Sequence, residues 1–232
     1  MLPLAERVVQ AYGGADRWKA ATSVHATVNA WGFAFFAKLR GGIRDMHVEA
    51  SLETPHVVSW NRGRPDLRRT FDGRSVEIED GVGNITALRH EPGRGFPYGR
   101  RLFYWDRLDE VYFSSYAIWN YLTLPALLMR DDIEWTDPGE TTLEAHFPPE
   151  LPTHCPVQQF HFDRDTALLR QHDYTAEVFG GWAKAANVVL SHSVSDGVPY
   201  PSHRRVTPRK GDGTPRGFPL LIDIRIQDWQ LV

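Results

Sequence analysis

Residues 168–178 read LLRQHDYTAEV, and this stretch decides the fold of the chain. In a β-strand, successive side chains point to opposite faces. One face of this segment therefore holds a mixed set: Leu168, Arg170, His172, Tyr174, Ala176 and Val178. The other face holds groups that favour water: Gln171, Asp173, Thr175 and Glu177. Polar side chains among apolar ones are typical of a pocket wall, so this strand is expected to line a cavity.

The same alternation predicts strands on both sides of this segment. They cover residues 24–30, 46–52, 133–136, 142–147, 157–162, 188–194, 198–206 and 220–227. The turn signal FDGR at 71–74 lies between two further strands, and residues 92–97, rich in Gly and Pro, form a loop. Long sheets of sequential antiparallel strands twist and curl instead of staying flat.

Two helices are expected beside the strands. Leu4, Val8 and Tyr12 share one face of an N-terminal helix, which is followed by a short helical turn at 15–20. A longer helix begins at the N-cap Asp106 and ends before Pro125. Because it is apolar nearly all round, it must be covered on more than one side. We therefore predict a mainly β (α+β) fold in which residues 1–232 form a single unclosed antiparallel barrel, or half-barrel, with this aromatic helix plugging its concave face.

Composition and net charge limit the kinds of partner and the location that the sequence predicts for this protein. The formal net charge is −3, and 42% of the 232 residues are hydrophobic. No stretch is apolar enough to span a membrane, and the charge gives no general attraction to nucleic acid. Residues 1–7 lack the features of a secretion signal, and the lone Cys155 excludes an internal disulfide, so a cytoplasmic location is expected.

Several segments resemble a known family. The stretches are FDRDTALL at 162–169, SDGVPYP at 195–201, IDI at 222–224 and YGGADRW at 12–18. They are similar to the LolA/LppX-like superfamily of bacterial lipoprotein carriers. More closely, AIWNYL at 117–122, TH at 153–154, RQHDY at 170–174 and RRV at 204–206 resemble a cytosolic bacterial subgroup of about this length. The resemblance implies an unclosed barrel with a helical lid over an apolar cavity, which exported relatives use to hold lipid chains.

Extending the alternation to neighbouring strands predicts one polar floor in the cavity. Its members would be Arg170, His172, Tyr174, His192, Tyr200, Ser202 and Arg204. Above it, the plug helix and a neighbouring strand would supply Tyr116, Trp119, Asn120 and Trp31. Buried guanidinium groups require an anionic partner. That partner is either an acid-tipped ligand or a helix carboxylate of Asp106, Asp109 or Glu110.

Histidines near neutral pKa on that floor suggest acid–base chemistry. His172 is the first candidate for the base, followed by His192 and then His154, with Tyr174 as a proton donor. No metal-binding, phosphate-binding or nucleophile-elbow motif occurs, so neither a metal nor a cofactor is expected.

Two functions follow. The first is a cofactor-independent lyase, isomerase or cyclase acting on a hydrophobic, aromatic or acid-tipped small molecule. The second is a non-catalytic carrier or sensor of an amphiphilic, lipid-like ligand. A scaffold with a filled interior is a third, and the sequence is compatible with a homodimer.

Overall fold

A computed structural model describes all 232 residues. The helices are α1 (Pro3–Ala11), α2 (Ala15–Ala20), α3 (Phe33–Phe36), η1 (Gly99–Leu102), α4 (Arg107–Leu122) and α5 (Leu124–Leu127). The strands of the first half are β1 (Ser23–Trp31), β2 (Ile43–Ser51), β3 (Val57–Asn61), β4 (Arg64–Phe71), β5 (Ser75–Glu79) and β6 (Ile85–His90). Those of the second half are β7 (Glu134–Gly139), β8 (Thr142–His146), β9 (Val157–Phe162), β10 (Leu169–Thr175), β11 (Lys184–Ser195), β12 (Val198–Pro208) and β13 (Ile222–Leu231).

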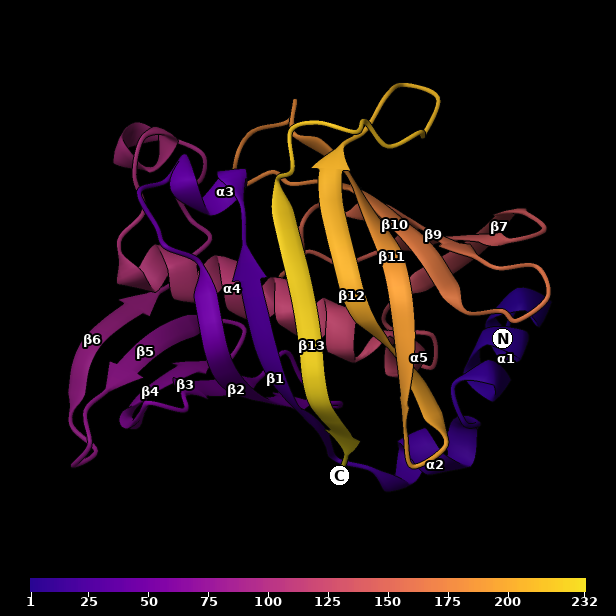
Figure 1. Ribbon diagram of the computed structural model, residues 1–232, viewed down its shortest axis with the longest axis horizontal. Coiled ribbons are helices and arrows are strands. Elements are labelled where there is room, and N and C mark those ends of the chain that lie inside the picture. The colour runs from indigo at the N-terminus through magenta and orange to yellow at the C-terminus, as the bar shows by residue number, and fades with distance from the viewer.

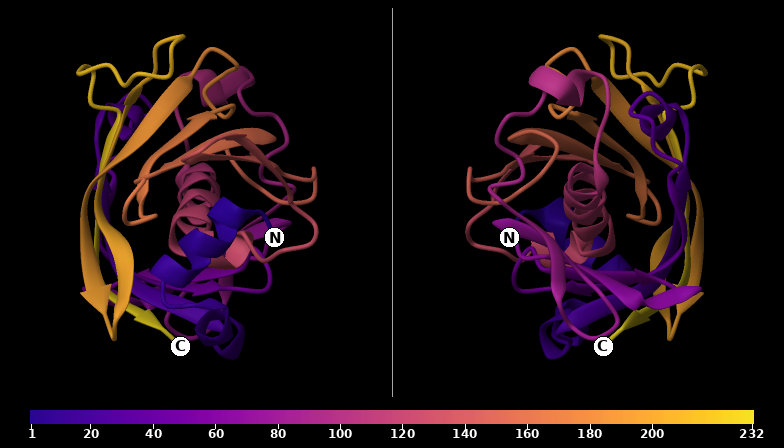
Figure 2. Two further views of the ribbon diagram at one scale, coloured as in Figure 1. Left: turned by 90° about the vertical axis from the view of Figure 1, so that its right-hand side faces the viewer. Right: turned by 90° about the vertical axis from the view of Figure 1, so that its left-hand side faces the viewer.

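All thirteen strands belong to one antiparallel sheet. Its order is β6-β5-β4-β3-β2-β1-β13-β12-β11-β10-β9-β8-β7, so two meanders join where β1 pairs with β13. The edges β6 and β7 do not pair with each other, and the barrel stays open. Figure 2 shows the sheet curving around α4, which runs along the hollow side. The predicted half-barrel is confirmed.

Helix α4 fills the concave side of the sheet. Thirteen of its sixteen residues are buried, as expected for a helix that is apolar nearly all round. Trp119 links the helix to the sheet, because its Nε1 donates a hydrogen bond to the Ser51 carbonyl oxygen over 2.8 Å. Asn120 donates from Nδ2 to the Tyr116 carbonyl oxygen over 2.8 Å. Both side chains thus hold the helix in place inside the sheet.

The start of α4 is a capping box with a buried charge cluster. Asp106 caps the helix by accepting from the Asp109 amide, and Asp109 accepts in return from the Asp106 amide. The Asp109 side chain has no exposed area. Its oxygens lie 2.7, 2.6 and 2.8 Å from nitrogens of Arg89, Arg100 and Arg101. Glu110 pairs with Arg40. The acids of the helix are therefore neutralised by loop and edge-strand arginines.

The upper end of the molecule in Figure 1 is built from the segments that join strands on that side. Helix α3, which the sequence pattern did not predict, lies there. Lys38, just after it, donates to the carbonyl oxygens of Arg101 and Leu102 over 2.9 and 2.7 Å. The amide of Phe33 donates to Leu220 over 3.2 Å. None of the helices is both long and apolar enough to cross a bilayer.

Candidate functional site

An apolar pocket of about 590 Å³ opens at the upper end of the sheet, and 14 of its 21 lining residues are hydrophobic. Aromatic and aliphatic side chains line much of it: Phe33, Leu102, Phe113, Phe179, Trp182 and Leu221. Its inner wall is the concave face of β10 to β12, represented by Tyr174, Ala185 and Val206. A cavity of this size and composition is in the range that holds small molecules.

The charged groups of the pocket wall are all cationic: Lys38, Lys184, Arg209 and Arg216. Lys38 is buried, forms no ion pair, and its pKa is lowered by desolvation. Arg209 lies 3.4 Å from Asp173, on the far face of the sheet, and its Nε has no hydrogen-bond partner. Lys184 and Arg216 are exposed. Since no Asp or Glu lines the pocket, its electrostatic field favours an anionic group.

His154 and Tyr174 form the base of the pocket. Their rings stack with centroids 3.8 Å apart. The two ring nitrogens of His154 lie 3.3 and 2.9 Å from the hydroxyls of Tyr116 and Tyr121. The Tyr121 hydroxyl also lies 2.9 Å from that of Tyr174. The base of the pocket is thus a closed hydrogen-bond network in which each polar group already has a protein partner.

The predicted bases are poor proton acceptors at neutral pH. Burial lowers the pKa of His154 to about 3, because a charged imidazolium is costly away from water. Burial and the nearby charges of His154 and Arg204 hold the pKa of His172 well below its usual value. His172 does not line the pocket; its ring stacks on Phe160 and its Nε2 lies 2.6 Å from Gln158. Neither imidazole is therefore a ready proton acceptor at the pocket wall.

Arg204 is a buried cation without a carboxylate. Only 1% of its surface is exposed, and burial lowers its pKa. Its Nη2 donates to the Tyr121 carbonyl oxygen over 3.2 Å, and the guanidinium lies 4.9 Å from the centre of the Tyr121 ring. Its Nε and Nη1 have no partner, nor has the side-chain amide of buried Asn187 on the neighbouring strand. Of the two alternatives for its partner, a carboxylate of the plug helix is therefore excluded, because those acids pair with other arginines.

An apolar replacement of Arg204 is expected to stabilise the fold. Arg204→Met should raise the free energy of unfolding in urea by about 1–3 kcal/mol, since the variant no longer buries an uncompensated charge. Arg205→Met, at the exposed neighbouring position, is the control and should change it by less than about 0.5 kcal/mol. Clear destabilisation by Arg204→Met would contradict the absence of a strong partner for this guanidinium.

Arg170 does not face the cavity, which corrects the prediction. Its side chain is 70% exposed and lies 3.0 Å from Asp163. The pairing of β10 with β9 has a bulge between Leu169 and Gln171. The alternation of inward and outward side chains is therefore shifted by one residue at that point. Leu169 and His172 are both buried, whereas Arg170 turns outward.

Irregular register also separates the remaining members of the predicted floor. The pairing of β11 with β12 shifts on both sides of Ser191. Ser202 consequently bonds to the Ser191 hydroxyl over 3.1 Å instead of entering the pocket. Trp31, at the end of β1, is 42% exposed and packs beside Arg225. The prediction that Ser202 and Trp31 line the cavity is therefore wrong.

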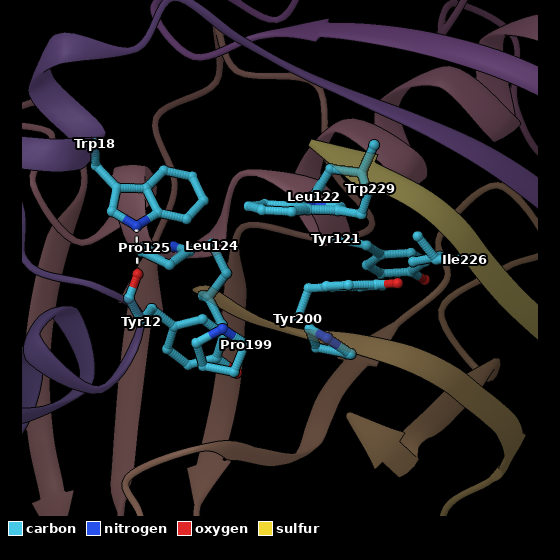
Figure 3. A pocket seen from close by; sticks show the side chains of 11 residues that line it. Tyr12, Trp18, Tyr121, Leu122, Leu124, Pro125, Pro199, Tyr200, Ile226 and Trp229 are labelled. Carbon is cyan, nitrogen blue, oxygen red and sulfur yellow. Dashed lines mark hydrogen bonds between the residues drawn. The ribbon is translucent and has the colours of Figure 1, made fainter. Parts of the chain in front are cut away.

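Tyr200 and His192 lie toward the lower end of the sheet. Tyr200 stacks on Trp229 with centroids 5.3 Å apart, beside a small cavity of about 10 Å³ (Figure 3). That cavity has room for about one water molecule. His192 lies 3.4 Å from the Tyr12 hydroxyl, and burial, with a smaller effect of Arg204, lowers its pKa to about 4. Neither residue reaches the large pocket.

One group of side chains could hold a metal ion. His25, His47 and Glu49 offer three ligand atoms that lie within 4.8 Å of one another. They stand on the convex face, because the alternating residues Ala26 and Val48 are buried against the core. This group is remote from the pocket, so it contributes nothing to binding there.

The protein is therefore a half-barrel: an unclosed antiparallel sheet wraps around a helix and has an apolar pocket at one end. No protein-family model and no curated protein matches the sequence. Three solved structures align with 98% of the chain. A DUF1329 family protein from Desulfovibrio piger has a TM-score of 0.51, 12% identity and 91% coverage of its own chain.

A domain assigned to outer membrane lipoprotein sorting, from Vibrio parahaemolyticus, has a TM-score of 0.50, 7% identity and 90% coverage. A LolA superfamily protein from Nitrosomonas europaea has a TM-score of 0.48, 8% identity and 93% coverage. The chain thus shares its fold with the Desulfovibrio piger and Vibrio parahaemolyticus structures, whose TM-scores are 0.51 and 0.50. At these identities the likeness concerns the fold alone.

Sequence reasoning missed the segments that shape the pocket mouth. Residues 33–36, FAFF, lie between Gly32 and the pair Gly41-Gly42, and they form α3. Such an apolar run outside the strand alternation was the available signal. Trp182 and Lys38 carried no signal, because isolated loop residues are placed only by the tertiary fold.

Proposed function

We propose that this protein binds an amphiphilic molecule, with an apolar body and an anionic end, in the pocket at the upper end of the sheet. It acts as a carrier or sensor and does not transform the ligand. The observation that carries this proposal is the lining of the pocket, which is mostly apolar and has four cationic and no acidic side chains. The apolar body would lie among Phe113, Phe179 and Trp182, and the anionic end near Lys184 and Arg216.

Carrier or sensor fits this geometry better than enzyme. His154 is the one histidine of the pocket lining, and its low pKa and two tyrosine partners leave no free base for proton abstraction. The half-barrel fold is compatible with an apolar ligand, since a curved sheet can enclose one against its concave face.

The experiment is a competition assay with 8-anilinonaphthalene-1-sulfonate, which combines aromatic rings with an anionic group. Dodecanoate is expected to displace this probe, whereas dodecyltrimethylammonium, with the same chain and opposite charge, is not. Mass spectrometry of the recovered dodecanoate should show it unchanged. Equal displacement by both amphiphiles would contradict an anion-selective pocket, and chemical conversion of the acid would contradict a carrier.

Reversing the two exposed cations tests the charge requirement. The double variant Lys184→Glu, Arg216→Glu should weaken dodecanoate binding about tenfold, because each exposed charge contributes up to about 1 kcal/mol. Lys19→Glu, an equally exposed reversal on α2, is the control and should bind as the wild type does. Unchanged binding by the double variant would contradict a role for these cations.

A further inference from the structure

Exposed apolar side chains gather around the mouth of the pocket. Four segments form this region, which we call the mouth surface: residues 32–42, 91–106, 176–183 and 209–221. They hold nine of the eighteen large hydrophobic residues that are exposed in the chain: Phe33, Phe36, Leu39, Tyr98, Leu102, Phe103, Tyr104, Trp182 and Phe218. Exposed apolar groups concentrated in one region mark an interaction surface.

The four segments make one surface, although they are far apart in the sequence. The Trp105 amide donates to the Lys38 carbonyl oxygen over 3.1 Å, which joins the second segment to the first. The Phe33 amide donates to Leu220, which joins the fourth. The rings of Trp105 and Phe179 lie 4.9 Å apart, which joins the third. Figure 1 shows α3 and the loop before β13 at the same end.

The mouth surface is also basic. Its four segments contain eight Lys and Arg and four Asp and Glu, whereas the whole chain has 26 basic and 29 acidic residues. Five of the eight cations form ion pairs and Lys38 is buried, which leaves Lys210 and Arg216 exposed and without an ion-pair partner. The most exposed aromatic side chains are Phe36, Phe103, Trp182 and Phe218, and they belong to segments with a formal excess of basic residues. Exposed aromatic rings with Lys and Arg around them are the combination that favours the headgroup region of an anionic bilayer.

We propose that the mouth surface docks on an anionic lipid membrane and so places the pocket opening against the bilayer. The aromatic tips enter the headgroup region, and the basic side chains contact lipid phosphates. This inference deepens the proposed function, on which it rests: it assigns the bilayer as the source or destination of the amphiphile. The amphiphile then passes between bilayer and pocket without crossing water.

The test is co-sedimentation of the full chain with vesicles of phosphatidylcholine alone and of phosphatidylcholine mixed with an equal share of phosphatidylglycerol. We expect binding to the anionic vesicles, weakened by added salt. The double variant Phe36→Ser, Phe103→Ser should bind them at least about tenfold more weakly, since two apolar anchors are lost. Because these side chains are 73% and 76% exposed, the variant should keep its fold.

The matched control is Val82→Ser, Ile85→Ser. These two residues are 82% and 54% exposed. Val82 lies in the turn between β5 and β6 and Ile85 begins β6, outside the mouth surface, so binding should stay at the wild-type level. Failure of the wild type to bind anionic vesicles would overturn the proposal, as would equal losses in both double variants. Vesicle-independent dimerisation that the Phe36 and Phe103 changes abolish would assign the surface to a second copy instead.

Failure here is separable from failure of the proposed function. Displacement of the fluorescent sulfonate by dodecanoate is measured without vesicles. If the protein binds dodecanoate but not vesicles, the pocket assignment stands and the docking surface is overturned. If it binds vesicles but not dodecanoate, the proposed function is overturned, and this inference falls with it.

Discussion

Replacement of Asp109 by alanine is expected to lower the free energy of unfolding by about 3–5 kcal/mol. The Asp109 carboxylate is completely buried and contacts Arg89, Arg100 and Arg101, and its removal leaves three guanidinium groups with too few acceptors. The change also removes half of the capping box of α4. Urea unfolding followed by tryptophan fluorescence measures the effect.

An exposed ion pair in the segment that also carries Arg100 and Arg101 gives the control for this prediction. Glu91 lies 3.2 Å from Arg94, and the two side chains are 71% and 85% exposed. Glu91→Ala should therefore change stability by less than about 0.5 kcal/mol. Similar effects of Asp109→Ala and Glu91→Ala would contradict the importance assigned to the buried cluster.

Acidification from pH 6.5 to pH 5 is expected to lower the free energy of unfolding by about 3–4 kcal/mol through His154 and His172 alone. Both have lowered pKa values in the folded protein, about 3 for His154 and well below normal for His172. The unfolded chain binds protons on both side chains near pH 6.5, whereas the folded chain keeps them neutral. Stability is therefore fully present above that pH and falls by about 1.4 kcal/mol per pH unit for each histidine below it.

A substitution that cannot titrate isolates one of these contributions. His172→Gln keeps a hydrogen-bonding group opposite Gln158, and it should reduce the slope of unfolding free energy against pH by about 1.4 kcal/mol per pH unit. The control, Ser202→Ala, removes no titratable group and should leave the slope as it is. An unaltered slope in His172→Gln would show that this imidazole is accessible to protons in the folded state.

The architecture was predictable because it depends on average patterns. Period-two alternation located most strands, and the all-round apolar character of residues 107–122 identified the plug helix. The cap at Asp106 was read correctly from its residue type and position. Patterns of this kind survive small irregularities, since each element is supported by many side chains.

The site was harder to predict, because it depends on register. A single bulge beside Leu169 turned Arg170 outward while His172 stayed inside. Two shifts in the β11–β12 register beside Ser191 likewise keep Ser202 out of the pocket. Bulges leave no reliable trace in the alternation itself, and one extra residue reverses every side chain beyond it. Three of the four cations that reach the pocket, Lys38, Arg209 and Arg216, come from connecting segments, which periodicity does not describe.

The pairing of β1 with β13 has a consequence for how the chain folds during synthesis. Val28 of β1 pairs with Ile226 of β13, about 200 residues later, so the centre of the sheet is the last part to close. Until β13 leaves the ribosome, β1 presents an open edge able to pair with other chains. Folding is consequently slow and exposed to aggregation. A nascent chain stalled before β13 should therefore need a chaperone to stay in solution.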